Sequence, residues 1–327
     1  MMRRVLVTGA TGFIGSNLIR ALTGKGIEVI ALRRESSRTT VSMNKLLQYR
    51  TGDIRESESI LRAIDGCDTV FHTAAVVSFW RAKRTKQLEV NVGGTRNIVE
   101  ACLKTGVQKL VHTSSVAALG FRTDRKLIDE TTAYNWGSNI GYKYSKHLAE
   151  LEILEGVGRG LNAVLVNPTV VVGPGDLNMH GGALVCDIAR GNIPAYSSGG
   201  MNLVSIQSVV AGHLAAAERG LPGERYILGG TNFTHKEAFG FIANVLRKSS
   251  PRFWSPVFVT KSVARVLDAV GRITGKEPWI TSELVSGLGL FNWYSCAKAH
   301  QELGYLPTSL EEAILEAYNW YSSNGMA

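Results

Sequence analysis

The sequence predicts an α/β fold in which a doubly wound parallel sheet is followed by a smaller, mainly helical C-terminal domain. In the first half of the chain, short runs of consecutive apolar residues alternate with helical patterns, and a glycine-rich turn follows the first run. Uninterrupted apolar strands separated by helices are typical of a parallel sheet covered on both faces. With 327 residues and a hydrophobic fraction of 45%, the chain is long enough to bury a large core and a smaller one.

The elements of the first domain are expected in a regular order. Strands are predicted at residues 5–7, 29–32, 46–49, 70–71, 109–112 and 163–166. After the first strand, Ile14, Leu18 and Leu22 share one face of a helix, which is the spacing of a helix that packs against a sheet. The clearest later helices are expected at about residues 87–105 and 142–155.

The pattern changes after Pro168. A glycine-rich stretch leads to a helix that ends near Gly191, and a strand at 203–206 followed by a helix to about Arg219 looks like a return to the sheet. The remainder of the chain is mainly helical in pattern. The predicted division is a first domain of residues 1–170 with 201–220 returning to it, and a substrate domain of residues 171–200 and 221–327.

Composition and charge exclude several classes of protein. The formal net charge is +9, but the basic residues are scattered and are not interleaved with aromatic residues, so nucleic-acid binding is not expected. The N-terminus lacks the apolar core of a signal peptide, and no run of about 18 apolar residues exists, so we expect no integral membrane segment and a cytoplasmic location. Residues 253–293 are rich in large apolar side chains; buried helix faces are the favoured interpretation, and peripheral membrane attachment remains open.

The cysteines and histidines give no sign of a metal site. The four cysteines lie far apart without paired spacing, and are interpreted as reduced and mostly buried. No cluster of His, Cys and Asp has ligand spacing, so no metal is expected. His72 and His112 end two predicted strands in apolar surroundings, where satisfied core residues are the favoured interpretation.

The glycine-rich turn indicates a dinucleotide-binding (Rossmann) domain. Gly9 can adopt the backbone angles of a tight turn, Gly12 removes a side chain where a pyrophosphate approaches, and Gly15 lets the helix pack close to the sheet. The helix N-terminus then offers free N–H groups and the positive end of its dipole to phosphates. The cofactor contacts expected at this turn are Gly9, Thr11, Gly12, Phe13, Ile14 and Gly15.

The end of the second strand favours NADP(H) over NAD(H). A carboxylate there would accept hydrogen bonds from the adenosine ribose, but this chain has Arg33 instead. A guanidinium can bind a 2′-phosphate with two hydrogen bonds. Arg33 is therefore the candidate phosphate ligand, with Ser36 and Arg38 as helpers. A solvated basic loop is the alternative interpretation, and NAD(H) remains open as the cofactor.

Further cofactor contacts are expected where the third and fourth strands end. Asp53 and the backbone of Ile54 could contact the adenine, and the small residues at 73–75 let the backbone pass close to the dinucleotide. Asn91 opens an Asn-Val-Gly-Gly stretch inside a predicted helix, which is locally unfavourable and suggests close packing or a role near the site. The expected contacts here are Asp53, Ile54, Thr73, Ala74, Ala75 and Asn91.

Tyr142, Lys146 and Ser115 are the candidate catalytic residues. Tyr142 and Lys146 are four residues apart and therefore lie on one face of a helix. A neighbouring ammonium stabilises a phenolate. Lowering the tyrosine pKa by ~3 units would require ~4 kcal/mol, which is plausible in a partly desolvated site beside a cationic nicotinamide. Tyr142 could then give a proton to a carbonyl oxygen or take one from an alcohol, while Lys146 holds the nicotinamide ribose. Ser115 ends the fifth strand, where its hydroxyl can donate a hydrogen bond to the same oxygen.

These residues resemble the extended short-chain dehydrogenase/reductase family along essentially the whole chain. The matching features are Thr8 to Gly15, Asp53, Thr73-Ala74-Ala75, Asn91, Ser115, Tyr142, Lys146 and Asn167-Pro168. The resemblance implies that Pro168, Thr169 and Val170 border the nicotinamide, that Thr113 and Ser114 add contacts beside Ser115, and that the C-terminal half holds the substrate. Within the family, the chain looks most like the dihydroflavonol-4-reductase-like branch, which includes hopanoid-associated sugar epimerase-like proteins.

Three functions are compared. The first is an NADP(H)-dependent reductase or dehydrogenase acting on a carbonyl or alcohol of a small molecule, and Arg33 favours it. The second is a nucleotide-sugar epimerase or dehydratase with tightly bound NAD. The third is a cofactor-sensing protein without turnover, which an intact Ser115, Tyr142 and Lys146 set argues against. Phe79, Trp80 and Tyr196 could line the substrate pocket or be packing residues. A homodimer is expected through the two long helices, by analogy with resembling proteins.

Overall fold

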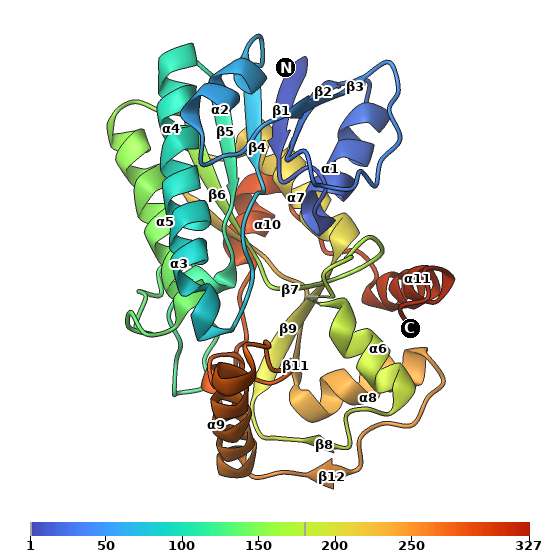
Figure 1. Ribbon diagram of the computed structural model, residues 1–327. Helices are drawn as coiled ribbons and strands as arrows, with labels where there is room; N and C mark the ends of the chain where they lie inside the picture. The colour runs from blue at the N-terminus through green and yellow to red at the C-terminus, as the bar shows by residue number, and fades with distance from the viewer. Residues whose placement is uncertain (1, 180) are drawn as a thin grey trace.

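A seven-stranded parallel sheet forms the centre of the protein. The computed structural model describes residues 2–179 and 181–327. The strand order is β10-β6-β5-β4-β1-β2-β3, and each adjacent pair is parallel (Figure 1). The strands are β1 (Arg4–Thr8), β2 (Glu28–Arg33), β3 (Leu47–Thr51), β4 (Thr69–His72), β5 (Lys109–Thr113), β6 (Ala163–Pro168) and β10 (Arg225–Leu228).

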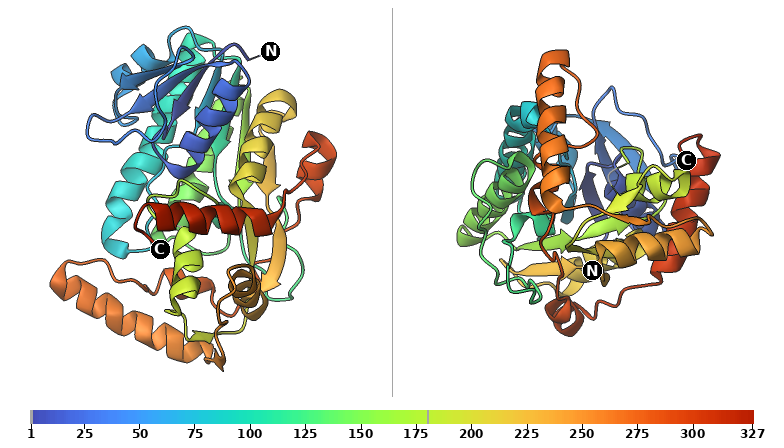
Figure 2. Two further views of the ribbon diagram at one scale, coloured as in Figure 1. Left: turned by 90° about the vertical axis from the view of Figure 1, so that its right-hand side faces the viewer. Right: turned by 90° about the horizontal axis from the view of Figure 1, so that it is seen from below.

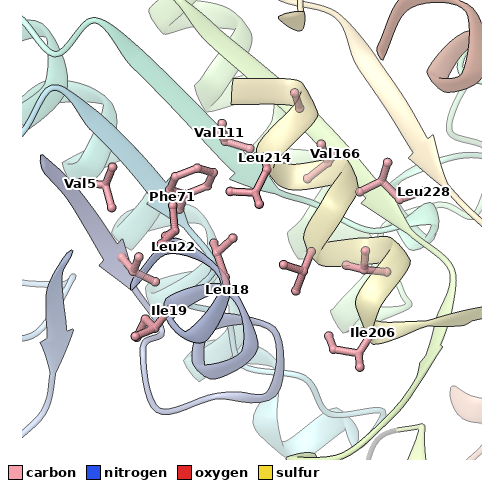
Figure 3. Close-up of a cluster of buried hydrophobic side chains, with 14 of the residues drawn as sticks. Val5, Leu18, Ile19, Leu22, Phe71, Val111, Val166, Ile206, Leu214 and Leu228 are labelled. Carbon is pink, nitrogen blue, oxygen red and sulfur yellow. The ribbon is translucent and has the colours of Figure 1, made fainter. Parts of the chain in front are cut away.

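Helices cover both faces of this sheet, which confirms the doubly wound α/β fold. One face packs against α2 (Ser57–Ile64), α4 (Gly94–Thr105) and α5 (Gly141–Gly158). The other packs against α1 (Phe13–Gly24), α7 (Ile206–Arg219) and α10 (Ala297–Leu303). On this second face, Leu18 and Leu22 of α1 meet Leu214 of α7 over Phe71 and Val111 of the sheet (Figure 3).

The rest of the chain forms a second layer at the carboxyl end of the sheet (Figures 1 and 2). A three-stranded sheet, ordered β11-β9-β7, packs against three helices around a separate core. A two-stranded sheet pairs β12 with β8, and a long helix follows it. The elements are β7 (Val170–Val172), α6 (Gly182–Arg190), β8 (Ala195–Tyr196), β9 (Gly200–Ser205), β11 (Thr231–Thr234), α8 (His235–Val245), β12 (Phe253–Trp254), α9 (Val257–Thr274) and α11 (Leu310–Ser323).

The predicted return to the main sheet is half correct. Helix α7 packs on β5 and β6, as expected for residues up to Arg219. The strand before it does not join the main sheet, because β9 pairs with β7 and β11. The seventh strand of the main sheet is β10, whereas the sequence pattern assigns residues 225–228 to the substrate domain, and α10 packs beside it. Both segments are short apolar runs, and local periodicity does not encode which distant strand a run will pair with.

The helix predicted at 87–105 begins slightly earlier and contains an irregular segment. α3 (Arg84–Gln87), which follows a 3₁₀ turn at Arg81–Lys83, runs into a π-helix at Leu88–Gly93 and then into α4. A Cβ added to Gly94 would lie 2.5 Å from the Ile54 side chain, so close packing accounts for the glycine. Two further 3₁₀ turns lie at Val116–Ala118 and Leu284–Gly287.

The interpretation of residues 253–293 as buried helix faces is wrong for α9. Phe258 is 71% exposed and Ile273 is 87% exposed, and burial within this fully described helix is confined to Ala264 and Gly271. No helix in the part of the chain that the structure describes has the length and apolarity needed to span a bilayer.

Candidate active site

The glycine-rich turn lies directly against the end of β4. Gly9 has a φ of 66°, and a Cβ there would lie 2.6 Å from the Ala74 nitrogen. Both the backbone angle and the lack of space therefore exclude a side chain at this position. A Cβ on Gly15 would lie 2.3 Å from the Gly9 carbonyl oxygen. The Thr73 hydroxyl donates to the Thr8 carbonyl at 2.7 Å, which fixes β4 to the turn. The roles predicted for Gly9 and Gly15 therefore have a direct packing cause.

Gly12 differs from these two glycines in a way that fits a bound dinucleotide. A Cβ on Gly12 would meet the Gly9 carbonyl oxygen at 3.2 Å and no other described atom within 4 Å. The protein's own packing therefore does not require glycine there, whereas a pyrophosphate approaching the first turn of α1 would. Thr11, Phe13 and Ile14 surround this point and are partly exposed.

Arg33 is placed at the end of β2 with part of its guanidinium unsatisfied. One terminal nitrogen donates to the Ser37 carbonyl oxygen at 3.2 Å, and the guanidinium lies 5.8 Å from the centre of the Tyr49 ring. The Nε atom is buried and has no hydrogen-bond partner among the described residues. Ser36 and Arg38 lie exposed in the same loop. An arginine held in place with donors to spare is chemically suited to bind a phosphate.

Asp53 and Ile54 are less free than the sequence indicated. The Asp53 carboxylate accepts three hydrogen bonds from Arg55, including the guanidinium pair at 2.8 and 3.1 Å. Hydrogen bonding from Arg55 lowers the pKa of this carboxyl, although burial opposes the shift. Ile54 is buried beneath Gly94, and its carbonyl accepts from Asn97 at 3.0 Å. Asp53 therefore lies at the expected sheet edge with its charge already paired.

Asn91 joins two segments of the site rather than pointing at one. Its amide exchanges two hydrogen bonds with the Val76 backbone, at 2.7 and 3.0 Å, and also donates to the Ser145 hydroxyl at 3.0 Å. The Ser145 hydroxyl in turn donates to the Tyr142 carbonyl at 2.8 Å. Asn91 lies in the π-helical segment, an irregularity that is frequent at functional sites. It holds the chain after Ala74 and Ala75 against the start of α5.

Tyr142 and Ser115 come together as predicted. Tyr142 is the second residue of α5, and its backbone N–H donates to the Glu283 carboxylate at 2.8 Å. Its ring lies 5.4 Å from the Phe79 ring in an edge-on arrangement. Burial raises the pKa of Tyr142 to about 12, while a hydrogen bond with Ser115 acts in the opposite direction. The Ser115 hydroxyl also accepts from the Ala117 N–H at 3.1 Å, which fixes its position after β5.

Lys146 is buried one helical turn after Tyr142. Its ammonium donates to the Thr113 carbonyl at 2.7 Å. Burial lowers the pKa of Lys146 to about 8, and the nearby Glu150 charge partly offsets this. In this structure the cost of burying the phenolate dominates the pKa of Tyr142, and the lowering expected beside Lys146 and a cationic nicotinamide stays a prediction. Tyr142 is therefore protonated throughout the neutral range.

A buried carboxylate behind the site is the main feature that the sequence analysis missed. Glu150 is fully buried on α5 and accepts from the Ser114 hydroxyl at 2.5 Å and from the Asn167 amide at 2.7 Å. Arg225 of β10 forms an ion pair with it at 2.6 Å. The Ser114 hydroxyl, predicted to contact the cofactor, is thus donated to Glu150. The sequence does indicate that Glu150 lies near the site, because it is four residues after Lys146 and therefore shares its helix face.

The residues after β6 are divided between the two layers of the molecule. Pro168 ends β6, and the Thr169 hydroxyl donates to the Asn202 side chain of β9 at 2.8 Å. Val170 is 37% exposed at the start of β7. Asn167 donates to the Ser115 carbonyl at 3.0 Å, which ties this segment to the catalytic serine.

A cavity of about 670 Å³ is walled in part by Phe79 and Glu283, which contact Tyr142, although Tyr142 itself does not line it. Among its walls are Phe79 and Trp80, for which the sequence leaves pocket lining and packing equally open, and Ile140 just before α5. Glu283, whose carboxylate holds the Tyr142 N–H, also lines it. The remaining lining residues are Arg81, Ala82, Asn139, Asp268, Gly271, Arg272, Gly275, Ser282 and Ser286. Tyr196, the third aromatic residue proposed for the pocket, is not part of this wall.

The two strand-end histidines behave differently. His72 is hydrogen-bonded to the hydroxyls of Thr8 and Thr95, at 2.7 and 3.0 Å, as expected of a satisfied core residue. His112 is equally buried, yet neither ring nitrogen has a partner in the described part of the chain. Among residues 2–179 and 181–327, no group of His, Cys, Asp and Glu side chains is arranged to hold a metal ion.

Comparison with known proteins identifies the family and supports the fold. Residues 5–229 match the model of the NAD dependent epimerase/dehydratase family. A putative dihydroflavonol 4-reductase from Synechocystis sp. is 34% identical, with 98% of this chain and 94% of the relative covered. The sterol demethylase protein B of Methylococcus capsulatus is 31% identical, with coverage of 98% and 99%. The crystal structure of gox2253 has a TM-score of 0.86 at 36% identity and covers 98% of each chain.

Two relatives of more than 30% identity thus cover nearly the whole chain, and the family model spans more than half of it. The chain belongs to the NAD dependent epimerase/dehydratase family, an extended short-chain dehydrogenase/reductase group of NAD(P)-dependent oxidoreductases.

Proposed function

We propose that the chain reduces a carbonyl group of a small apolar molecule with NADP(H), or oxidises the corresponding alcohol. The observation that carries this proposal is the meeting of Tyr142, Ser115 and Lys146 at the carboxyl edge of the sheet, beside a cavity of about 670 Å³. Ligands bind at this edge in open α/β sheets, and cavities of this size hold small organic molecules.

The reaction needs one hydride and one proton, and the protein supplies the proton. The dinucleotide, when bound, supplies the hydride to the carbonyl carbon. Tyr142 is protonated at neutral pH, and burial raises its pKa further to about 12; it donates its hydroxyl proton to the carbonyl oxygen. Ser115 donates a hydrogen bond to the same oxygen, and Lys146 places a positive charge near the phenolate left behind. In the reverse direction the phenolate takes the alcohol proton.

NADP(H) is proposed as the cofactor because of Arg33. Its Nε is buried without a partner among the described residues, while its terminal nitrogen is held by the Ser37 carbonyl. No ion pair of Arg33 is found among the described residues. A 2′-phosphate would supply its counter-charge, whereas a ribose hydroxyl would leave the charge unpaired.

The proposed substrate has apolar bulk next to its carbonyl group. Phe79, Trp80 and Ile140 provide apolar and aromatic cavity walls near Tyr142. The Methylococcus relative named sterol demethylase protein B covers 98% of this chain, which supports a substrate of this kind. Arg81 and Arg272 are opposed by Asp268 and Glu283 on the same walls, so the lining does not select a polyanion.

An epimerase or dehydratase with tightly bound NAD is the second candidate, because the family model carries that description. The substrate in that case would be a nucleotide sugar, whose diphosphate requires cationic side chains as partners. Two arginines of the C-terminal half are engaged elsewhere: Arg225 is paired with Glu150, and Arg190 donates to the Met326 carbonyl at 2.7 Å. These two side chains serve separate parts of the structure, which favours the reductase.

The proposal is tested by titrating NADPH and NADH against wild type and Arg33→Ala, using quenching of protein fluorescence. We expect wild type to prefer NADPH. Loss of charge-assisted hydrogen bonds worth about 1.5–3 kcal/mol should weaken NADPH binding by about 10- to 100-fold in Arg33→Ala. NADH binding should be unchanged. Arg34→Ala, at the exposed neighbouring position, is the matched control and should behave like wild type.

Turnover of a panel of apolar ketones and of nucleotide sugars distinguishes the two reactions. Tyr142→Phe should lose turnover of every accepted ketone while keeping NADPH affinity, because the ring and its packing on Phe79 remain. A wild-type preference for NADH together with epimerisation of a nucleotide sugar would contradict the proposal and establish the second candidate.

A further inference from the structure

Helix α9 and its flanks form an exposed apolar surface at one end of the molecule. Phe258, Val266 and Ile273 are 71%, 63% and 87% exposed. The exposed aliphatic residues recur at spacings of four and three, so they form one continuous stripe along the helix; they are Val259, Val263, Val266, Val270 and Ile273. A continuous apolar stripe of this kind is unusual on a helix surface that faces only water.

Aromatic side chains extend this stripe at both ends of α9. Phe253 and Trp254 of β12 are 70% and 59% exposed, and Trp279 after the helix is 76% exposed. α9 and β12 lie at the end of the molecule opposite the N-terminus (Figures 1 and 2). We call Phe253, Trp254, the exposed apolar residues of α9 and Trp279 the α9 surface. Tryptophan is enriched where proteins meet the boundary between lipid and water.

The same segment is strongly basic. Between residues 247 and 277 the chain carries seven basic and two acidic side chains; they are Arg247, Lys248, Arg252, Lys261, Arg265, Arg272 and Lys276, with Asp268 and Glu277. Within α9, Lys261, Arg265 and Arg272 are spaced four and seven residues apart and so form a row along one side of the helix. Arg265 and Arg272 are exposed.

We propose that the α9 surface docks the protein onto an anionic lipid bilayer. An amphipathic helix with an apolar face, tryptophans and a basic margin lies in the interface plane, with its apolar side chains in the acyl boundary and its basic residues at the anionic headgroups. A second copy of the chain is the other occupant for a stripe with this spacing. It would place two rows of like charge side by side, which opposes association.

The location of the large cavity gives this docking a purpose. Asp268, Gly271 and Arg272 of α9 line the cavity beside Tyr142. The helix that would contact the bilayer is therefore also a wall of the proposed substrate site, and an apolar substrate could pass between membrane and cavity without crossing water. The docking itself does not depend on the proposed reaction, so the two can fail separately.

The test is flotation of the full-length protein with vesicles of equal parts phosphatidylcholine and phosphatidylglycerol. We expect wild type to float with these vesicles, and binding to fall with added salt and with vesicles of phosphatidylcholine alone. Each exposed apolar side chain removed in Phe258→Ser, Val266→Ser and Ile273→Ser should lower the partition coefficient by about tenfold. Arg252→Gln and Arg265→Gln should each lower it by about fivefold.

Leu221→Ser and Leu306→Ser are matched controls, since these leucines are 54% and 65% exposed on other parts of the surface. They should float as wild type does. A triple variant combines Phe258→Ser, Val266→Ser and Ile273→Ser. The proposal would be overturned if wild type failed to bind the anionic vesicles, or if the triple variant bound them as well as wild type does. Sedimentation velocity without lipid gives a further check. A dimer in wild type and a monomer in the triple variant would also overturn the proposal, because the α9 surface would then join two copies of the chain.

Discussion

Glu150 carries a carboxylate that is fully buried behind the catalytic serine and is held by three other side chains. Its partners are Ser114, which directly follows β5, Asn167 of β6 and Arg225 of β10, so a single side chain connects the ends of three neighbouring strands to α5. One of these partners, Asn167, also donates to the Ser115 carbonyl. The ion pair with Arg225 neutralises a charge that would otherwise be costly to bury.

Arg225→Met should therefore destabilise the protein. Removing one partner of a buried pair leaves an uncompensated charge, and because Arg225 is itself partly exposed we expect a loss of about 2–3 kcal/mol in the free energy of unfolding. Urea denaturation measures it. Arg96→Met is the control: it removes the exposed partner of Glu152, which lies on α5 like Glu150. It should lower the free energy of unfolding by less than about 1 kcal/mol. Equal effects of the two substitutions would show that the Glu150 network has no special weight.

At this scale, the residues whose roles depend on local spacing were predictable. Gly9, Gly15 and the Tyr142–Lys146 pair each follow from a turn or a helix period. The pKa of Tyr142 was not predictable, because its direction depends on burial by residues distant in sequence, such as Phe79. The same applies to Ser114, whose hydroxyl could be assigned to the cofactor or to Glu150 only once α5 was placed beside β5.

Among the elements, the π-helical segment at Leu88–Gly93 is the one most closely tied to the site. It widens the helix at the point where Asn91 reaches both Val76 and Ser145. A regular α-helix would rotate the residues before Asn91 relative to those after it. The sequence indicated the irregularity through its Asn-Val-Gly-Gly stretch, but not its form, since a π-helix has no propensity signature of its own.

Asn91→Ala should weaken both the fold and cofactor binding. It leaves the Val76 N–H and carbonyl without their partner, which we expect to cost about 2–3 kcal/mol of unfolding free energy. NADPH affinity should fall as well, because the segment after β4 is no longer held against α5. Asn97→Ala, on the same continuous helix, loses one hydrogen bond to Ile54 and should cost about 1 kcal/mol. Unfolding and fluorescence titration of both variants check this; unchanged NADPH affinity in Asn91→Ala would separate the π-segment from the site.

For the molecule as a whole, buried histidines set the response to acid. Burial holds the pKa of His72 at about 3, that of His213 at about 4, and that of His112 well below its usual value. Because the folded-state pKa values are depressed, the unfolded state binds more protons. These groups contribute stability that is present above pH of about 6.5 and is lost as the pH falls toward the folded-state values.

His112→Leu should reduce this sensitivity. Neither ring nitrogen of His112 has a partner in the described part of the chain, so replacing the ring removes a desolvation cost. Between pH 7 and pH 5 the variant should lose about 2 kcal/mol less unfolding free energy than wild type. Denaturant unfolding of both proteins at pH 7 and pH 5 measures the difference. Between pH 8 and pH 7 the difference in unfolding free energy between variant and wild type should be nearly constant. A parallel loss in both proteins would show that His112 titrates normally.

The overall α/β architecture was predictable because alternating apolar strands and helices admit few other arrangements. The order of strands beyond β6 was not. Residues 201–205 and 225–228 are both short apolar runs, and their partners are decided by the path of α7 and the loops around it. The exposure of α9 was also beyond reach, since an apolar helical stripe looks the same in sequence whether a core or a membrane covers it.

The placement of β10 has a consequence for how the chain folds as it is synthesised. Six strands of the main sheet are complete once residue 168 has emerged, but the edge of β6 stays unpaired until residues 225–228 follow. During that interval the nascent chain presents an open, apolar strand edge, the kind of surface that recruits chaperones or pairs wrongly with another chain. Arg225 arrives with the same strand, so the Glu150 carboxylate also gains its counter-ion at that late stage. Closing the sheet and neutralising its buried charge are one event in the life of the nascent protein.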